Sequence, residues 1–199
     1  MGKRIRIATT DDAQAIQGIY APIVADSCIS FEIEVPSVLE MARRIQEVQR
    51  QFPWLVFECQ GEVLGYAYAS SHRARRAYQW CTEVTVYVHS KAHKRGVGRS
   101  LYRCLFQLLR WQGYVNAYGV IALPNPSSIC LHESMGFVRV AVYPGIGFKQ
   151  GAWRDVSWWH LRLQEPPNPP PPPVPIGSLL REERVARTFA DAAHATGIE

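Results

Sequence analysis

One basic, glycine-bearing turn carries the residue types needed to bind a phosphate. The turn is His93-Lys94-Arg95-Gly96-Val97-Gly98; it follows the strand-forming run Val86-Tyr87-Val88 and precedes an amphipathic stretch that starts at Arg99-Ser100. Glycine lacks a Cβ, so its backbone N–H can approach phosphate oxygens, and a helix N-terminus favours an anion. The glycine spacing matches neither a P-loop nor a dinucleotide fingerprint. The turn therefore predicts a phosphorylated ligand, with an ordinary strand-to-helix connection as the alternative.

The positive charge of the chain gathers around this turn. The formal net charge is +5, and the nearby cations are Arg73, Arg75, Arg76, Lys91, Lys94, Arg95 and Arg99. A basic patch fits either a nucleic acid or one small polyanionic cofactor. The glycines favour the cofactor, because they serve a ligand that touches the backbone, which contact with a duplex does not require. We therefore expect a small phosphorylated ligand and no nucleic-acid partner.

Composition is typical of a globular cytoplasmic protein. The chain has 199 residues, of which 47% are hydrophobic, enough for one domain with a core. Its five cysteines are scattered and never spaced as C-x-x-C, which argues against a zinc site and against a secreted disulfide framework. The N-terminus lacks the apolar stretch of a signal peptide, and no apolar run is long enough to span a bilayer. We expect a cytoplasmic location, no metal and no membrane contact.

Hydrophobic periodicity and turn residues predict a mixed α/β fold, mostly strands with a few covering helices. The expected strands are residues 5–7, 54–59, 63–70, 81–88, 115–123, 137–143 and 156–163. The expected helices follow residues 10–12 to about 25 and span 37 to about 51, 98–111 and 126–135. Ser37 and Glu40 form a capping box, while Gly113 and Gly136 end the last two helices.

The composition changes abruptly at Glu165, where a proline-rich run begins that reaches Pro175. Such a run adopts an extended polyproline conformation and cannot form a packed helix or a central strand. It predicts a domain over residues 1–164, a linker over 165–177 and a tail over 178–199, with a weak helix over 179–195. We expect a spacer and a loose tail; a ligand for an aromatic-lined groove on a partner is the alternative.

Several separated stretches, in a fixed order, carry a family resemblance from Ile5 to Leu163. They are Ser30-Phe31-Glu32, Pro53-Trp54-Leu55-Val56, Gly65-Tyr66-Ala67-Tyr68-Ala69, Arg75-Arg76-Ala77-Tyr78, Glu83 with Val86-Tyr87-Val88, Arg95-Gly96-Val97-Gly98, Leu123-Pro124-Asn125, Leu131-His132-Glu133, Gly136-Phe137 and Phe148-Lys149-Gln150-Gly151-Ala152-Trp153-Arg154-Asp155. The ordered set resembles the GNAT acetyltransferase superfamily and, within it, the phosphinothricin N-acetyltransferase-like branch. The proline-rich tail lies outside it.

The resemblance implies a fold and a cofactor. The fold is the GNAT fold, a central, mostly antiparallel, splayed sheet with covering helices, and the cofactor is acetyl-CoA. The glycine turn corresponds to the family's pyrophosphate loop, with His93 where Gln or Arg is usual. The cofactor-binding residues so implied are Val86, Tyr87, Val88, His93, Lys94, Arg95, Gly96, Val97, Gly98, Arg99, Ser100, Asn125 and Ser128.

Two residues are implied to carry the chemistry. A free amine attacks a thioester only when neutral, and near neutral pH it is largely protonated, so the site needs a base. Glu83 matches the glutamate with that role in the branch; by residue type alone it is a surface carboxylate paired with an arginine. His132 matches the position that assists departure of the CoA thiolate. Its alternative is a helix histidine satisfied by its neighbours.

The acceptor contacts implied by the resemblance are Phe31, Arg75 and Tyr78. A guanidinium at Arg75 suits the carboxylate of an amino acid, although the flanking arginines also fit a solvated basic loop. The resemblance thus predicts an acetyl-CoA-dependent N-acetyltransferase for a small amino-acid-like acceptor of the phosphinothricin or methionine sulfoximine type, working as a homodimer. The alternatives are a protein N-acetyltransferase and a non-catalytic acyl-CoA-binding module.

Overall fold

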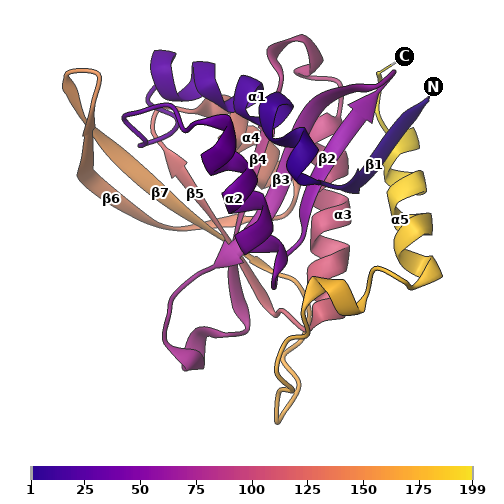
Figure 1. Cartoon of the computed structure of the whole chain (residues 1–199). Helices are drawn as coiled ribbons and strands as arrows, with labels where there is room; N and C mark the ends of the chain where they lie inside the picture. The colour runs from indigo at the N-terminus through magenta and orange to yellow at the C-terminus, as the bar shows by residue number, and fades with distance from the viewer. Residues whose placement is uncertain (1, 199) are drawn as a thin grey trace.

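The computed structural model describes residues 2–198 and shows a seven-stranded sheet with helices on both faces (Figure 1). The strands are β1 (Lys3–Ile7), β2 (Trp54–Cys59), β3 (Glu62–Ser71), β4 (Cys81–Val88), β5 (Asn116–Ala122), β6 (Val138–Lys149) and β7 (Ala152–Arg162). The longer helices are α1 (Ala13–Asp26), α2 (Val38–Gln49), α3 (Val97–Gln112), α4 (Pro126–Ser134) and α5 (Glu183–His194). The predicted mixed α/β class with a mostly antiparallel sheet is confirmed.

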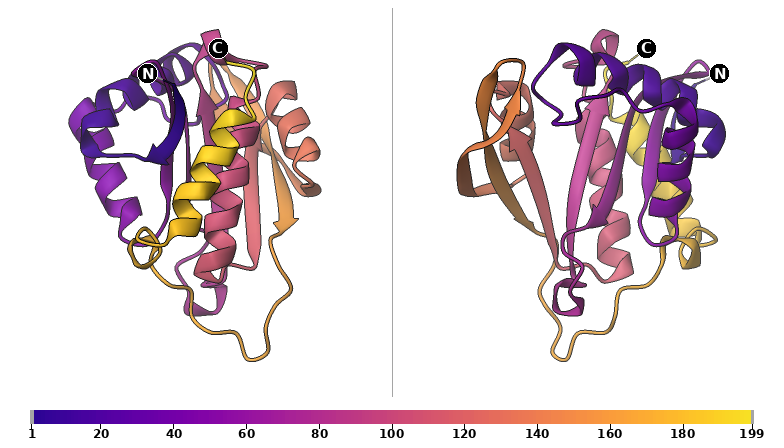
Figure 2. Two further views of the ribbon diagram at one scale, coloured as in Figure 1. Left: turned by 90° about the vertical axis from the view of Figure 1, so that its right-hand side faces the viewer. Right: turned by 60° about the vertical axis from the view of Figure 1, so that its left-hand side comes forward.

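The sheet has one parallel contact, and the two strands that make it separate. The strand order is β1-β2-β3-β4-β5-β7-β6, and every neighbouring pair except β4 and β5 is antiparallel. The register of β4 on β5 covers only Cys81–Asn116, Thr82–Ala117 and Glu83–Tyr118. Beyond these pairs the strands diverge, as the right-hand view of Figure 2 shows. The sheet is therefore split from the middle of β4 onward.

Alternation along β2 explains the two cores. Side chains of a strand point to opposite faces in turn. Leu55 and Phe57 belong to the core under α3, whereas Trp54 and Val56 belong to the core under α1 and α2. All six residues of β2 are buried, as expected for a strand covered on both faces.

The last hairpin is longer than the sequence indicated. The sequence predicts strands over residues 137–143 and 156–163, yet β6 continues to Lys149 and β7 begins at Ala152. The register of β6 on β7 shifts between Tyr143 and Gly147, so the proline sits in an irregular stretch. It is tolerated there because β6 is an edge strand and its pairing with β7 is interrupted over these residues.

The residues after Glu165 pack onto the domain, in contrast to the expected loose tail. The polyproline segment is tied down at two points: Trp80 Nε1 donates to Pro171 O at 2.8 Å, and Gln112 Nε2 donates to Val174 O at 2.8 Å. After a short 3₁₀ helix, Ile176–Ser178, helix α5 lies along α3 and against β1 (Figure 2). The helix propensity of residues 179–195 predicts only a weak helix. Burial of one face of α5 against the domain stabilises it.

No helix between residues 2 and 198 combines the length and the apolar character needed to cross a bilayer.

Candidate active site

Glu83 lies where the sheet begins to split. It pairs with Ser70 on β3 and with Tyr118 on β5, and it is the last residue of β4 that pairs with β5. From Val84 onward, backbone groups of β4 that face β5 have no ladder partner within residues 2–198. Such groups can bind an extended ligand as a neighbouring strand would. A ligand placed there would have its end beside Glu83.

A histidine that the sequence did not single out holds Glu83. His72 Nδ1 lies 3.0 Å from Glu83 Oε1; because an ionised carboxylate only accepts hydrogen bonds, the nitrogen donates. The Glu83 side chain is 29% exposed and that of His72 13%. Contact with His72 thus leaves Glu83 Oε2 as the oxygen open to a substrate proton.

Aromatic side chains surround this pair. The His72 ring stacks on Tyr118 at a centroid distance of 4.6 Å and meets the edges of Trp158 at 5.8 Å and Tyr78 at 6.1 Å. The only clue to His72 in the sequence is its position one residue past β3, near the partner of Glu83 in an antiparallel pair. That clue requires the strand register, which the sequence does not specify.

His132 lies on the opposite face of the split. Along β5, Tyr118 and Gly119 face opposite sides, Tyr118 toward His72 and Gly119 toward His132. A Cβ built on Gly119 would lie 2.6 Å from His132 Nε2, so a glycine is required for this close approach. A group held in the split would therefore have Glu83 on one face and His132 on the other.

Both ring nitrogens of His132 are engaged. Nδ1 donates to the Ser128 carbonyl at 2.8 Å, which leaves Nε2 to accept from the Tyr102 hydroxyl at 3.2 Å. His132 is 3% exposed, and this burial lowers its pKa, while burial raises the pKa of Tyr102. The imidazole is thus neutral and carries no free N–H, so it cannot release a proton without breaking one of these bonds.

The glycine turn offers open backbone donors. Lys94 (φ +59°) and Gly96 (φ +83°) adopt the left-handed conformation, which turns neighbouring N–H groups toward a common point. Helix α3 begins at Val97 without a side-chain cap, so its first N–H groups remain available. Lys94, Arg95 and Arg99 are exposed around the turn. The donor set and the charge both fit a pyrophosphate.

The side chains of the other predicted cofactor-binding residues on β4 and α3 point in different directions. Val97 and Ser100 point into the core at 1% and 2% exposure. Tyr87 packs on Tyr20 under α1, at a centroid distance of 5.1 Å. Val86 and Val88 face the other way, toward Gly98 at the start of α3. Val97 and Ser100 can therefore meet a ligand only through main-chain atoms.

Three further predicted residues make local contacts that shape the site. His93 Nε2 donates to the Val88 carbonyl at 2.9 Å, which ties the turn to the end of β4. Asn125 Oδ1 accepts from the Ser128 N–H at 3.1 Å and caps α4. The Ser128 hydroxyl lies 3.3 Å from His132 Nδ1. These side chains thus hold the loop and α4 in place around the split.

The predicted acceptor residues come from two places. Tyr78 lies beside His72, and Arg75 is exposed at the start of the same short 3₁₀ helix, Arg76–Tyr78. Phe31 packs on β6 instead: a Cβ built on Gly147 would lie 2.2 Å from its ring, so only glycine leaves room there. Buried Lys149 holds the Phe31 loop on β6 by donating to Val24 O and Ser30 O, both at 2.7 Å.

An unsatisfied donor lies near His72. Trp158 Nε1 is buried and has no hydrogen-bond partner within residues 2–198, and the Arg73 guanidinium lies 5.7 Å over the same indole ring. A buried N–H without an acceptor is costly unless a ligand supplies one. No group of three or more His, Cys, Asp or Glu in the described part of the chain could hold a metal ion.

Comparison with known proteins gives one consistent result. The Acetyltransferase (GNAT) domain family matches residues 5–158. Phosphinothricin N-acetyltransferase of Streptomyces viridochromogenes is 37% identical over 167 residues, which cover 83% of this chain and 91% of the relative. The L-methionine sulfoximine/L-methionine sulfone acetyltransferase of Salmonella typhimurium is 36% identical over 166 residues, 83% of this chain and 97% of the relative.

Solved structures agree with these relatives. A GNAT superfamily phosphinothricin acetyltransferase from Sinorhizobium meliloti, solved in complex with AcCoA, has a TM-score of 0.80 and 32% identity. The similarity covers 86% of this chain and 94% of that chain. An N-acetyltransferase from Staphylococcus aureus has a TM-score of 0.80 and 28% identity, over 82% of this chain and 100% of that one.

Proposed function

Because the chain belongs to the GNAT acetyltransferase family and is an acetyl-CoA-dependent N-acetyltransferase, we propose that Glu83 is the base that activates a small amino-acid-like acceptor. The observation that carries this proposal is the position of Glu83 at the last pair before β4 and β5 separate. The family relationship supports the predicted use of acetyl-CoA, which supplies an activated acetyl thioester.

The cofactor is held along the split. The N–H groups of the Lys94–Gly98 turn and of the first turn of α3 bind the pyrophosphate, and the exposed cations add charge. The free backbone edge of β4 binds the extended arm. From Glu83 to Val88 the strand spans about 16 Å, so the reacting end and the phosphate end are well separated.

Glu83 removes the amine proton. Oε2 faces the acceptor, directly or through one water, while His72 fixes the other oxygen and thereby the direction of the carboxylate. The N–H groups at the start of the split stabilise the oxyanion that forms when the amine nitrogen bonds to the acetyl carbon. This assignment gives His72 a positioning role that a phenyl ring could not fill.

His132 works from the opposite face as a positioning residue. Its neutral ring fixes α4 against Gly119 and orients the Tyr102 hydroxyl, so it shapes the wall of the split on the side where the thiolate departs. Direct protonation of the thiolate by His132 is disfavoured, because both nitrogens are engaged and burial lowers the pKa.

The acceptor is anionic as well as amine-bearing. Arg73 and Arg75 lie exposed in the segment that follows His72, and a guanidinium there suits a carboxylate. The relatives in Streptomyces and Salmonella bear the names of acceptors of this kind, phosphinothricin and methionine sulfoximine or sulfone. We assign the same substrate class here.

An acceptor screen tests this assignment. Release of CoA thiol from acetyl-CoA is measured with phosphinothricin, methionine sulfoximine, methionine sulfone and a set of peptides with free N-termini. The matched control is decarboxylated methionine sulfone, which keeps the amine and the sulfone and lacks the carboxylate. Loss of charge-assisted hydrogen bonds should lower kcat/KM for this control by about 10- to 100-fold. Activity on peptides alone, or equal use of the decarboxylated amine, would refute the proposal.

We also propose a homodimer formed through the last hairpin. Strand β6 is an edge strand, and it exposes a set of apolar side chains that β7 extends: Val138, Val140, Val142, Ile146, Phe148 and Trp153. Trp153 is 69% exposed and packs edge-on against Phe148 at 5.5 Å. An exposed apolar patch on an edge strand marks a surface that packs against another protein surface.

Light scattering after size exclusion measures the dimer directly. Phe148→Asp should shift the protein to the monomer mass, because it buries a charge in the apolar surface. The control Leu39→Asp changes an apolar residue that is 81% exposed on α2 and should leave the dimer mass unchanged. A wild type of monomer mass at micromolar concentration would contradict the proposal.

We place the enzyme in the cytoplasm, where reduced cysteines persist and acetyl-CoA is consumed. The scattered cysteines and absence of any C-x-x-C pair in the sequence support this location. Fractionation that recovered the activity outside the cytoplasm would overturn it.

A further inference from the structure

Residues after α5 lie against the outer side of the glycine turn. The Gly197 N–H donates to the Arg95 carbonyl at 2.9 Å. A Cβ built on Gly96 would lie 3.7 Å from Ala195 O and 3.8 Å from Thr196 Cα, so the two backbones are in contact. These residues lie well beyond residue 158, where the match to the family ends. The contact is therefore a feature of this chain that the family match does not cover.

The bond to Arg95 fixes the direction of a donor on the other side of the turn. The peptide group between Arg95 and Gly96 is trans, so its carbonyl and its N–H point in opposite directions. When Gly197 holds the carbonyl on the outer side, the Gly96 N–H must point inward, away from the tail. It then lies among the N–H groups assigned to the pyrophosphate.

The turn needs such support. Lys94 has φ +59°, a conformation that costs free energy for a residue with a Cβ, and Gly96 has φ +83°. Arg95 lies between two left-handed residues, where rotation of one peptide group would turn an N–H away from the ligand. A hydrogen bond to the Arg95 carbonyl restricts this rotation before any ligand binds.

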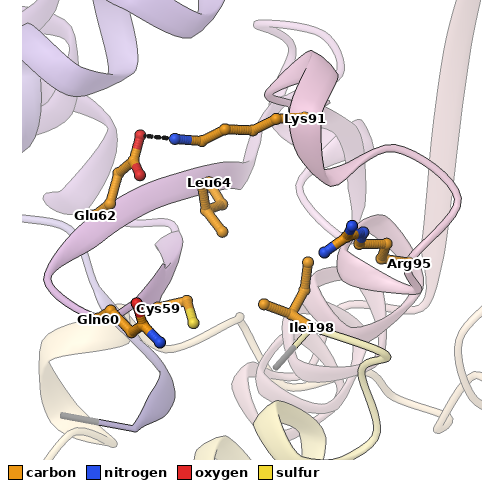
Figure 3. Close-up of a pocket in the computed structure, with 7 residues that line it drawn as sticks. All are labelled: Cys59, Gln60, Glu62, Leu64, Lys91, Arg95 and Ile198. Atoms are coloured by element: carbon orange, nitrogen blue, oxygen red, sulfur yellow. Dashed lines mark hydrogen bonds and ion pairs between the residues drawn. The ribbon is translucent and has the colours of Figure 1, made fainter.

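Further contacts anchor the tail. Lys3 Nζ on β1 donates to Thr196 O at 3.2 Å, and α5 packs along α3, the helix that the turn opens. Ile198 is 4% exposed and points toward Leu64 and Arg95 (Figure 3). A pocket of about 390 Å³, lined by these three residues and Lys91 among others, lies beside it.

We propose that residues 195–198 form a clamp that sets the glycine turn for acetyl-CoA, with Gly197 as its positioning residue. The inference rests on the proposed assignment of the turn to the pyrophosphate. The clamp contributes to the affinity for the cofactor and leaves the chemistry at Glu83, near the other end of β4, unchanged.

Two substitutions at Gly197 separate the clamp from general stability. Gly197→Pro removes the N–H donor, whereas Gly197→Ala keeps it, and the added Cβ would lie 3.9 Å from Arg95 O, an ordinary contact. Gly197→Pro should raise KM for acetyl-CoA and Kd for CoA by about three- to tenfold. For Gly197→Pro, kcat at saturating substrates and KM for the acceptor should stay within about twofold of wild type. For Gly197→Ala, kcat and both KM values should stay within about twofold of wild type.

A chain that stops after Ala195 provides a second variant and should show the same increase in KM, because α5 ends before the deleted residues. Unchanged KM for acetyl-CoA in both variants would overturn the clamp. A lower Tm with unchanged KM would also overturn it, since that is the effect of a purely structural tail. A fall in kcat with constant KM would place the tail's effect elsewhere and refute the proposal.

Amide hydrogen exchange distinguishes failure of the clamp from failure of the proposed function. If CoA does not protect residues 94–98 in the wild type, the turn is not the cofactor site, and both proposals fall. If CoA protects them and the ligand-free Gly197→Pro variant exchanges as slowly as wild type, only the clamp fails. We expect protection by CoA in both proteins and faster exchange of the ligand-free turn in the proline variant.

Discussion

Replacing Glu83 by Gln is expected to lower kcat by about 10²- to 10⁴-fold while CoA affinity stays within about twofold. The amide keeps the shape of the side chain and can still accept from His72, but it cannot take the amine proton. CoA affinity is retained because the pyrophosphate turn lies at the far end of β4. Steady-state kinetics with a saturating acceptor and calorimetric titration of CoA measure the two quantities.

The matched control for this change is Glu133→Gln, an exposed glutamate on α4, which should leave kcat and CoA affinity unchanged. Turnover of Glu83→Gln within tenfold of wild type would remove Glu83 as the base. Rising pH should also rescue the variant partly, because a larger share of the acceptor is then neutral without help. No rescue between neutral pH and pH 9 would assign Glu83 to binding.

Gly119→Ala is expected to lower the free energy of unfolding by about 1 to 3 kcal/mol and kcat by at least about tenfold. Its Cβ would lie 2.6 Å from His132 Nε2 and 2.7 Å from Cδ2, distances at which the ring must move. The ring has little room, since Tyr102 and Ser128 hold its two nitrogens. Urea unfolding and steady-state kinetics measure these losses.

Gly18→Ala is the control, because nothing lies within 4 Å of a Cβ built at this exposed position of α1. Alanine favours a helix over glycine by about 0.5 to 1 kcal/mol, so this variant should be at least as stable as wild type. Full activity in Gly119→Ala, with His132 displaced in its crystal structure, would limit His132 to folding. Unchanged stability would show that the ring is free to move.

Local signals in the sequence were sufficient for most of the elements. Strand β4 has the expected bounds because residues 81–88 are rich in β-branched and aromatic side chains. Gly113 ends α3 in the left-handed conformation, φ +96°, that a C-terminal glycine indicates. Ser37 caps α2 by accepting from the Glu40 N–H at 3.1 Å. Each of these features depends on neighbours a few residues away.

Features set by tertiary contacts were not predictable. The pair of His72 and Glu83 depends on how β3 and β4 align, and no residue type in the intervening segment fixes that register. The packed tail depends on the apolar surface that α3 and β1 present, which exists only after the sheet has formed. Strand β6 continues past Pro144 because it lies at an edge, a fact of topology.

The bond between Lys3 and Thr196 joins residues 193 positions apart. A ribosome that adds about 5 to 20 residues per second needs about 10 to 40 s to travel from β1 to α5. Throughout that interval the surface of β1 that α5 covers stays open to water or to a chaperone, and the surface of α3 joins it once residues 97–112 have been made. The nascent domain can complete its sheet before its last helix exists, so the cofactor turn is the last part of the site to reach its final shape.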